Sequence, residues 1–292
     1  MNTSSDAWME AMRSGDFARA WEISDSVLAT RRASGPCWHL PRHEQWVWDG
    51  RLLAGKRVLV RCYHGLGDTL QFARFLPMLG EICGELTVWA QPPLLPLLER
   101  LASPCKVLPL HEGVPPIDYD VDIEIMEVAH ALRTTIESLP EHVPYFQVEP
   151  EPRRSSALCI GVVATAGPWD ARRSVPLELM PTLAEAPGVR LYNLQLDTPV
   201  PRAVNISTSD ILTLAARMRG LDLVVTADTM VAHLAGALAV PTWTLLTADA
   251  DWRWMRHRDD SPWYPTMRLF RQPAPGDWGS VIQRVRASLG GA

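Results

Sequence analysis

Lysine is nearly absent from this sequence, in which Lys56 and Lys106 are the two lysines among 28 basic residues. A site for an anion must therefore use arginine, hydroxyl groups or backbone N–H groups, and the guanidinium fork suits phosphate oxygens. There is also no excess of positive charge, since the net charge is −5. This balance argues against a general affinity for nucleic acid, although it leaves room for local basic patches.

Long apolar runs are missing as well. The longest, such as residues 231–238, are broken by His, Gly, Pro or Glu well short of the roughly 18 residues that a membrane span needs. We therefore predict no transmembrane helix. The first six residues contain no basic segment followed by an apolar core, so a secretory signal is not expected.

The cysteines are few, odd in number and far apart. There is no C-x-x-C pair and no histidine at the spacing of a zinc ligand, which argues against a metal site. We expect reduced, mostly buried thiols in a cytoplasmic protein. The five residues are Cys37, Cys62, Cys83, Cys105 and Cys159.

The 292 residues, 47% hydrophobic and 21% charged, suit a globular chain of two domains. The first 50 residues have helical periodicity with a turn at 14–16. From Arg57 onward, short β-branched runs alternate with helical segments, the pattern of βαβ units and a parallel sheet. A stretch at 144–156, rich in proline and charge, is the best linker between two such α/β halves.

We therefore predict a helical extension at 1–50, a first α/β domain at 51–150, a second at 151–275 and a closing helix at 276–292. The first domain offers strands at 57–61, 86–90 and 106–108, with helices near 69–79 and 94–101. The second offers strands at 158–163, 189–194, 221–226 and 242–246, with helices near 177–184, 209–218 and 229–238.

Two further patterns concern the exposure of side chains. Val121, Ile123 and Ile125 alternate with acidic residues, which predicts a half-exposed strand with a solvated acidic face rather than a metal site. Tryptophan is concentrated in the first 50 residues and again after residue 240. Packing of these terminal segments on the core is favoured over a carbohydrate-stacking role.

A first candidate site follows the apolar run 58–61, where a glycine-containing turn leads into a helix. In an open parallel sheet such a loop lies at the carboxyl edge, where ligands bind. The glycines permit tight backbone geometry, and Asp68 is either a functional carboxylate or a helix cap. The spacing does not match G-x-G-x-x-G, so a dinucleotide fingerprint is not supported. The candidates are His64, Gly65, Gly67, Asp68 and Thr69.

A second candidate site follows the run 223–227, where polar residues again lie at a helix start. Free N–H groups and the positive end of the helix dipole make such a terminus a receptor for phosphate. Asp228 would repel an anion, so we expect it to cap the helix or to orient its neighbours. His233, one turn into the helix beyond Thr229, is either a phosphate contact or a satisfied core histidine. Two such loops in two half-domains indicate a cleft site.

Several blocks of sequence carry a more specific signal. They are Gly65–Pro77, Gln91–Leu95, Asp228–Leu238, and Asp251–Trp254 through Asp259–Pro265. Together they resemble the family 9 glycosyltransferases related to ADP-heptose:lipopolysaccharide heptosyltransferases, from about Gly15 to the C-terminus. The branch that resembles the chain most is the one linked to tetratricopeptide repeats, because Gly15-Asp16-Phe17-x-x-Ala20-Trp21 is similar to the last helix pair of such an array.

The resemblance implies an α/β protein of GT-B architecture, in which two Rossmann-like domains face a cleft and a short helical extension precedes them. It implies an inverting transfer that needs no metal and no cofactor, from a nucleotide-diphosphate sugar to a hydroxyl acceptor. ADP-heptose is the family's default donor, and the acceptor is a glycan, lipopolysaccharide or protein. No nucleic acid partner and at most peripheral membrane contact are expected, and a homo-oligomer remains open.

The resemblance also assigns roles to residues. Asp68 takes the position of the general base, which removes the proton of the acceptor hydroxyl. Asp228, Thr229 and His233 take the position of the donor diphosphate site, with Arg173 and Thr165 as further donor contacts. His64, Gly65, Gly67 and Thr69 support the loop or the acceptor.

One segment departs from the family pattern, since the loop at 164–174 is shorter and lacks the lysine of some heptosyltransferases. A second hypothesis is therefore kept, a non-catalytic or partner-dependent binding module of the same fold that has lost donor chemistry. A nicotinamide enzyme is disfavoured because neither glycine loop has the required spacing. The basic stretch at 253–258 is expected to pair with the acidic residues around it.

Overall fold

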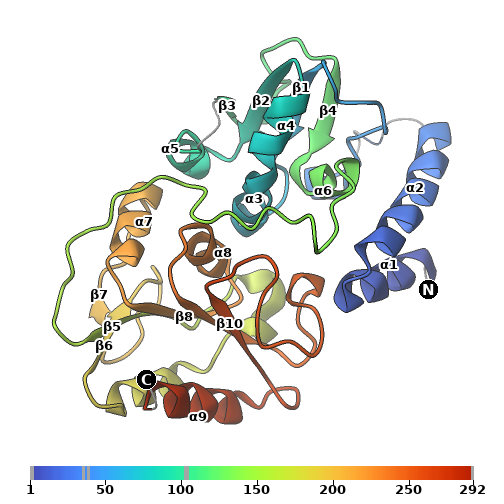
Figure 1. Cartoon of the computed structure of the whole chain (residues 1–292). Helices are drawn as coiled ribbons and strands as arrows, with labels where there is room; N and C mark the ends of the chain where they lie inside the picture. The colour runs from blue at the N-terminus through green and yellow to red at the C-terminus, as the bar shows by residue number, and fades with distance from the viewer. Residues whose placement is uncertain (1–2, 35–36, 38–39, 102–104, 291–292) are drawn as a thin grey trace. The chain divides into compact units, whose positions relative to one another are not determined.

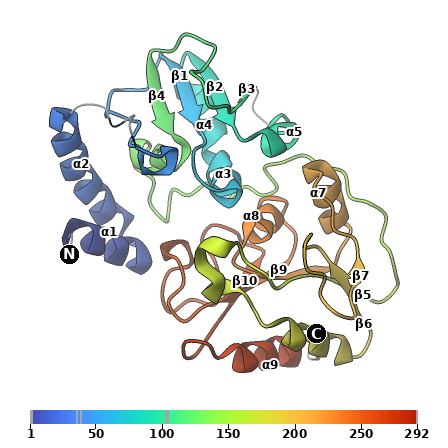
Figure 2. The ribbon, with the colours of Figure 1, turned by 180° about the vertical axis from the view of Figure 1, so that it is seen from behind.

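The computed structural model describes residues 3–34, 37, 40–101 and 105–290. Their contacts divide the chain into two compact units, Met1–Pro140 and Glu141–Ala292 (Figures 1 and 2). The sequence predicts the boundary later, at residue 150. The segment that follows Pro140 belongs to the second unit because the backbone N–H of Tyr145 donates to the carbonyl of Ala237 at 3.1 Å.

The first unit is built on a parallel sheet with the strand order β3-β2-β1-β4. Val60 in the centre of the sheet pairs with Val88 on one side and with Ile123 on the other. All three side chains are fully buried, as is usual for parallel strands covered on both faces. The strands are β1 (Arg57–Arg61), β2 (Glu85–Ala90), β3 (Lys106–Pro109) and β4 (Val121–Glu124).

The helices of the first unit are shorter than the sequence predicts. The helix expected at 69–79 is divided into α3 (Leu66–Phe72), η2 (Ala73–Phe75) and α4 (Leu76–Ile82). Pro77 stands in the first turn of α4, where its missing N–H is tolerated and a new helix begins. Prolines likewise limit the helix expected at 94–101. It is present as η3 (Pro92–Leu94) and α5 (Leu95–Leu98), and η4 (Ile125–Glu127) and α6 (Val128–Ala131) follow β4.

The N-terminal helical pair is present as predicted. It turns at Gly15, whose φ of +83° is a conformation that glycine adopts readily. Trp21 attaches the pair to the rest of the first unit, since its Nε1 donates to the carbonyl of Thr134 at 2.6 Å and its ring stacks on His130. The helices are α1 (Thr3–Ser14) and α2 (Phe17–Ser34), and η1 (Arg42–Glu44) lies between them and β1.

The interpretation of the acidic strand is wrong. All of β4 is buried, and Asp122 and Glu124 are 8% and 2% exposed, whereas the alternation predicts a solvated acidic face. Arg61 on the neighbouring strand supplies the missing charge, with its Nη2 2.8 Å from Asp122 Oδ2. A carboxylate can be buried when charge partners and hydrogen bonds replace its water.

The second unit holds a larger parallel sheet with the order β10-β9-β8-β5-β6-β7. Its four central strands correspond to the predicted ones, and two unpredicted strands extend its edges. Strand β7 is too short to show a period of two. The central strands are β5 (Leu158–Val163), β6 (Val189–Asn193), β8 (Leu223–Ala227) and β9 (Thr242–Leu246), and the edges are β7 (Val204–Asn205) and β10 (Met267–Arg271).

Three of the helices predicted for the second unit are present: α7 (Ile211–Arg219), α8 (Met230–Ala237) and α9 (Trp278–Leu289). The fourth, expected at 177–184, is a 3-10 segment, η6 (Leu177–Glu185), with Pro181 inside it. Proline removes a backbone donor and clashes with the carbonyl four residues earlier, so an α-helix is disfavoured there. Two further 3-10 segments are η5 (Pro168–Arg173) and η7 (Trp252–Trp254).

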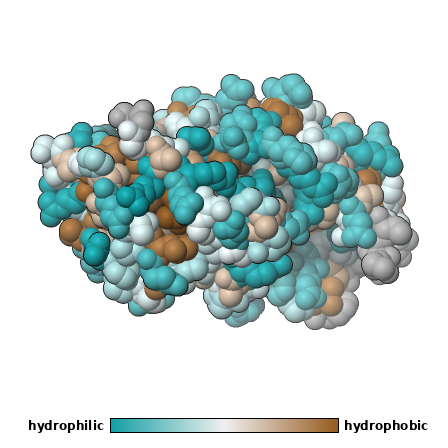
Figure 3. Space-filling view, turned by 90° about the horizontal axis from the view of Figure 1, so that it is seen from below, coloured by the Kyte–Doolittle hydropathy of each residue, from teal (hydrophilic) through white to brown (hydrophobic). Residues whose placement is uncertain are grey.

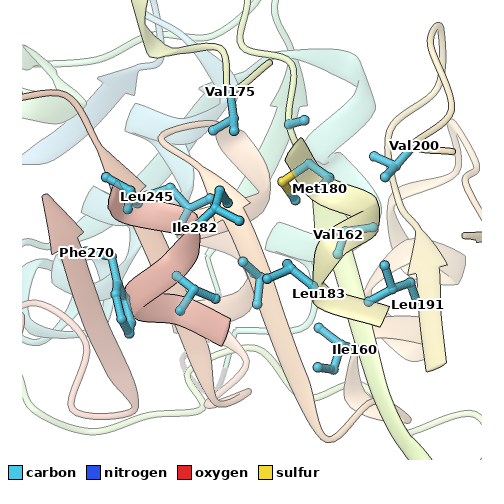
Figure 4. Packing of buried hydrophobic residues seen from close by; sticks show 14 of the residues in the cluster. Ile160, Val162, Val175, Met180, Leu183, Leu191, Val200, Leu245, Phe270 and Ile282 are labelled. Atoms are coloured by element: carbon cyan, nitrogen blue, oxygen red, sulfur yellow. The ribbon is translucent and has the colours of Figure 1, made fainter. Parts of the chain in front are cut away.

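Helices cover both faces of this sheet. In Figure 1, α7 and α8 lie on one face and α9 on the other. The face under α9 buries a continuous apolar cluster, part of which Figure 4 shows from close by. Strand residues Ile160, Val162 and Leu245 pack there with Met180 of η6 and Ile282 of α9.

The predicted packing of the tryptophans is confirmed for six of them, since Trp21, Trp48, Trp252, Trp254, Trp263 and Trp278 are buried. All five cysteines are free, and Cys37, Cys62 and Cys159 are buried. Hydrophilic residues predominate on the face in Figure 3, with apolar ones between them. Among the described residues, no helix combines the length and the apolar character that crossing a bilayer requires.

Candidate functional site

Each sheet contains one point at which the strand order changes direction. In the first unit β2 lies on one side of β1 and β4 on the other, and in the second unit β6 lies on one side of β5 and β8 on the other. At such a switch point, the loops that follow the two neighbouring strands diverge. Open α/β sheets bind their ligands in the crevice between these loops. Both predicted candidate loops begin at these two points.

The loop after β1 is closed by Asp68. Gly65 precedes the first turn of α3, and its backbone N–H donates to Asp68 Oδ2 at 2.8 Å. A Cβ at position 65 would lie 3.1 Å from the same oxygen, a tight contact that glycine avoids. Asp68 therefore does cap the loop, and because its side chain stays partly exposed the capping contact does not remove it from the candidate site.

Two other predicted residues are held by Gln91, which follows β2. Thr69 Oγ1 donates to Gln91 Oε1 at 3.0 Å, and Gln91 Nε2 donates to the carbonyl of His64 at 2.7 Å. Thr69 is fully buried. It contributes to the loop by fixing Gln91, while Gly67 lies in the first turn of α3.

A buried glutamate that the sequence analysis did not single out belongs to the same loop. Glu124 Oε1 accepts the N–H of Tyr63 at 3.2 Å and lies 3.0 Å from His64 Nδ1, and Oε2 accepts the N–H of Met126 at 2.7 Å. The side chain of His64 is 30% exposed. A buried carboxylate beside one ring nitrogen orients an imidazole. In the sequence, Glu124 belongs to the acidic run whose alternation predicts a solvated strand face, so its burial was not expected.

The half-buried Glu127 brings a second carboxyl group to the end of β4. Glu127 Oε2 accepts the backbone N–H groups of Trp48 and Glu124, each at 3.0 Å. Burial raises the pKa of Glu127 from 4.5 to about 7, although both hydrogen bonds favour the ionised form. Burial also raises the pKa of Asp122, against the opposing charge of Arg61. Strand β4 and the turn after it thus bring three acidic side chains to one switch point.

In the second unit, Arg173 at the end of η5 reaches the loop after β8. Its Nη1 donates to the carbonyl oxygen of Asp228 at 3.0 Å and lies 3.8 Å from Asp228 Oδ2. Burial raises the pKa of Asp228 from 3.8 to about 6. The nearby charge of Asp251 adds to this effect, and the charges of Arg173 and Arg253 oppose it. The structure therefore brings together two predicted residues that lie far apart in the sequence.

Thr229, rather than Asp228, caps the second helix. Its Oγ1 accepts the backbone N–H of Val231 at 3.2 Å, at the start of α8. Of the two roles expected for Asp228, capping the helix and orienting its neighbours, the contacts fit the second, because its carbonyl accepts a hydrogen bond from Arg173. A guanidinium beside the N-terminal N–H groups of a helix is an arrangement that stabilises an anion.

Thr165 lies on the loop after β5, and its hydrogen bonds are to Gln195, which follows β6. Its Oγ1 accepts Gln195 Nε2 at 3.3 Å, and its backbone N–H donates to Gln195 Oε1 at 3.1 Å. The residue is exposed. It shares the carboxyl edge of the sheet with Arg173.

His233 is 6% exposed and packed among aromatic rings. Its Nδ1 lies 3.0 Å from the hydroxyl of Tyr264, and its ring stacks on Trp254 with centroids 5.4 Å apart. Gly236, on the next turn, lets Tyr264 approach, since a Cβ there would lie 2.3 Å from the tyrosine ring. These contacts are those of a core histidine, and a contact of His233 with a donor phosphate stays a prediction.

Two arginines of the basic stretch after β9 are paired with neighbouring aspartates, as expected. Arg253 lies 2.8 Å from Asp251, and Arg258 lies 2.6 Å from Asp260. No cluster of three or more His, Cys, Asp or Glu side chains suited to a metal ion was found within the described ranges.

No profile of a known protein family matches the sequence. Protein FlbA of Caulobacter vibrioides is 26% identical to the chain over an alignment of 323 residues, which covers 94% of this chain and 52% of FlbA. The chain thus spans about half the length of the curated relative that it matches.

Solved glycosyltransferases share the fold. A family 9 glycosyl transferase from Veillonella parvula has a TM-score of 0.51 at 12% identity, over 83% of this chain and 99% of that one. Escherichia coli ADP-heptose lps heptosyltransferase II has a TM-score of 0.56 at 14% identity, over 80% and 98%. The iron-containing dodecameric glycosyltransferase TibC of enterotoxigenic E. coli, also solved in complex with ADP-D-β-D-heptose, has a TM-score of 0.56 at 12% identity, over 82% and 78%.

These structures confirm the predicted resemblance at the level of the fold. The chain has the α/β architecture of the GT-B heptosyltransferases, with two parallel sheets and N-terminal helices. The link to tetratricopeptide repeats stays a prediction.

Proposed function

We propose that this chain is an inverting glycosyltransferase that needs no metal and no cofactor. The observation that carries the proposal is the contact of Arg173 with the carbonyl of Asp228, directly before the start of α8. A guanidinium and free helix N–H groups are the anion ligands that remain to a chain with so little lysine. The fold shared with heptosyltransferases supports the same conclusion.

The donor that we propose is a nucleotide-diphosphate sugar, with ADP-heptose as the default. TibC, which shares the fold, is solved with such a donor. Arg173, Thr229 and His233 contact the diphosphate, and Thr165 contributes its hydroxyl. Asp228 acts through Arg173, which it orients by its carbonyl and carboxylate.

On the acceptor side, the carboxylate of Asp68 takes the proton of the attacking hydroxyl. The acceptor oxygen forms a bond to the anomeric carbon from the face opposite the diphosphate, and the bond to the diphosphate breaks with both electrons leaving on the phosphate oxygen. This single displacement inverts the anomeric configuration. The charge that develops on the diphosphate is stabilised by Arg173 and the first N–H groups of α8.

The remaining loop residues have supporting roles in this proposal. Gly65, Gly67 and Thr69 hold Asp68 in place, and His64 lies beside the acceptor. The acceptor is a glycan, lipopolysaccharide or protein hydroxyl. We place the reaction in the cytoplasm, where free thiols persist.

A matched pair of arginine variants tests the donor site. Calorimetric titration with ADP-heptose and ADP should show binding to the wild type and a loss of about 10- to 100-fold in affinity for Arg173→Gln, the usual effect of removing a charge-assisted hydrogen bond. Arg172 is the control, because it is exposed and pairs with Asp170 at 2.8 Å. Arg172→Gln should bind ADP, which carries no donor sugar, within about twofold of the wild type.

The same titration separates the two hypotheses for the chain. Binding accompanied by sugar transfer or by release of ADP from the donor supports the enzyme. Binding without either reaction supports the alternative, a binding module of the GT-B fold that has lost donor chemistry. If a panel of ADP-, UDP- and GDP-linked sugars shows no binding at all, the donor site is disproved.

A further inference from the structure

Trp169 is exposed, unlike the buried tryptophans near the two ends of the chain. Its exposed fraction is 80%, the largest of any tryptophan within the described ranges. An indole presents a large apolar surface whose burial is worth a few kcal/mol. Single exposed apolar side chains are common on proteins, so the position of this one decides its meaning.

The position of Trp169 is set by a loop that carries its own hydrogen bonds. Asp170 Oδ1 accepts the N–H and the Nε of Arg172, at 3.1 and 2.8 Å. The backbone N–H of Ser174 donates to the carbonyl of Ala171 at 3.0 Å, and Ser174 Oγ accepts the N–H of Ala166 at 3.0 Å. The loop is closed on itself, and the indole stays outside it.

One guanidinium connects this indole to the candidate anion site. The central carbon of the Arg173 guanidinium lies over the ring of Trp169, 5.0 Å from its centroid. The same guanidinium donates to the carbonyl of Asp228 before α8. Because the ring is so exposed, the cation covers part of one face and leaves an aromatic surface in solvent. The indole is therefore an apolar wall directly beside the proposed diphosphate position.

We propose that Trp169 is a stacking platform for the sugar of the donor. This inference rests on the proposed glycosyltransferase function. The sugar is bonded to the diphosphate, so it lies close to the groups that hold the phosphates. One face of a sugar ring carries C–H groups that are apolar and slightly positive, and the face of an indole is negative. Stacking the two removes apolar surface of both from water.

The neighbours of Trp169 favour a sugar over a nucleobase. Asp170 and Arg172 present a planar carboxylate and a planar guanidinium on the same short segment, and the Arg172 side chain is 80% exposed. Such groups form paired hydrogen bonds with neighbouring hydroxyls. A ring face with polar partners beside it suits a sugar, because a sugar has an apolar face and several hydroxyl groups that need hydrogen-bond partners.

The test compares each sugar nucleotide with its parent diphosphate. The probes are ADP-heptose with ADP, UDP-glucose with UDP, and GDP-mannose with GDP, titrated calorimetrically into the full chain. For the pair that the wild type binds, Trp169→Ala should weaken the sugar nucleotide about 3- to 10-fold and leave the parent diphosphate within about twofold. Trp169→Phe keeps an aromatic face and should recover most of the loss.

Leu196→Ala is the matched control, since Leu196 is also an exposed apolar residue of the second unit, at 56%. It should leave both affinities unchanged. An unchanged affinity of Trp169→Ala for the sugar nucleotide would overturn the inference while the proposed function stands. An equal loss for the parent diphosphate would also overturn it, by assigning the indole to the nucleobase. If the wild type binds none of the probes, the proposed function itself fails.

Discussion

The two switch points have equivalent places in their sheets and opposite chemistry. In the first unit Asp68, at the start of the helix after β1, and Glu124, at the end of β4, lie at the carboxyl edge. In the second unit the loops after β5 and β8 bring Arg173 and the start of α8 to the same edge. The parallel sheet thus determines where a site can form. The residues of the loops decide whether that site can accept a proton or bind an anion.

Each point also contains one buried group of the opposite sign. Arg61 lies within the acidic cluster and is paired with Asp122, and Asp228 lies beside Arg173 at the second point and is paired with it. A buried charge needs such a partner, because its desolvation is costly. The difference between the two points is therefore one of net charge, with an ion pair at the base of each.

The two switch points should differ most in their effect on the rate of catalysis. If the first supplies the base and the second only binds the donor, Asp68→Asn should lower turnover about 10²- to 10⁴-fold and leave the affinity for ADP within about twofold. Asparagine keeps an oxygen for the N–H of Gly65, so the loop is retained. The rate of ADP release from ADP-heptose and a titration with ADP measure the two effects. Unchanged turnover would remove Asp68 as the base, and His64 with Glu124 would be the next candidate.

The ion pairs between β1 and β4 allow a comparison of burial alone. Arg61→Met leaves Asp122 buried without its partner and should lower the free energy of unfolding by about 3 to 5 kcal/mol. The control is Arg57→Met, whose partner Asp120 directly precedes β4 and lies at the same 2.8 Å distance, but whose pair is exposed. That variant should cost less than about 1 kcal/mol. Urea unfolding at pH 7 measures both, and equal losses would show that burial does not change the cost of losing the partner.

The pH dependence of stability should reveal the buried carboxyl group of the second switch point. Burial raises the pKa of Asp228 from 3.8 to about 6, so the folded state binds the proton more tightly than the unfolded state does. Stability is then unaffected below about pH 4, falls as the pH rises through 6, and stays lower above it, by up to about 3 kcal/mol. Asp228→Asn should therefore be more stable than the wild type at pH 8 and equal to it at pH 4.

Glu127→Gln gives the matching measurement in the first unit. The pKa of Glu127 is raised to about 7. The gain in the free energy of unfolding of Glu127→Gln over the wild type should therefore appear about one pH unit higher than that of Asp228→Asn. Urea unfolding at pH 4, 6 and 8 distinguishes the two variants. A wild-type stability that is constant between pH 4 and 8 would contradict both predictions.

The interior of each sheet and both candidate loops could be predicted, because they follow local rules. Val58–Val60 and 223–227 are apolar runs that end in polar and small residues, and strands, turns and helix starts are recognised from such short patterns. Two local features differ from the prediction, and they involve a proline and a helix cap. Pro181 turned a predicted α-helix into a 3-10 segment, and Thr229 occupies the capping position that was one of the two roles expected of Asp228.

The contacts of the candidate site could not be predicted in the same way. Glu124 and His64 meet because β4 pairs with β1, although many residues separate them in the chain. The sequence does not distinguish the exposed Trp169 from a tryptophan of the core. Its exposure follows from the closed loop around Asp170 and Ser174.

The amino-acid sequence by itself determined the two α/β halves, their glycine and helix-start loops and the scarcity of lysine that leaves anion binding to Arg173 and backbone N–H groups. Periodicity and turn chemistry act over a few residues, so they can be recognised without knowing the rest of the chain. Tertiary structure alone decided which charges are buried, which of them are paired and which aromatic ring remains in solvent. Those outcomes depend on strand register and on the groups that replace water around each side chain, and these come from distant parts of the chain.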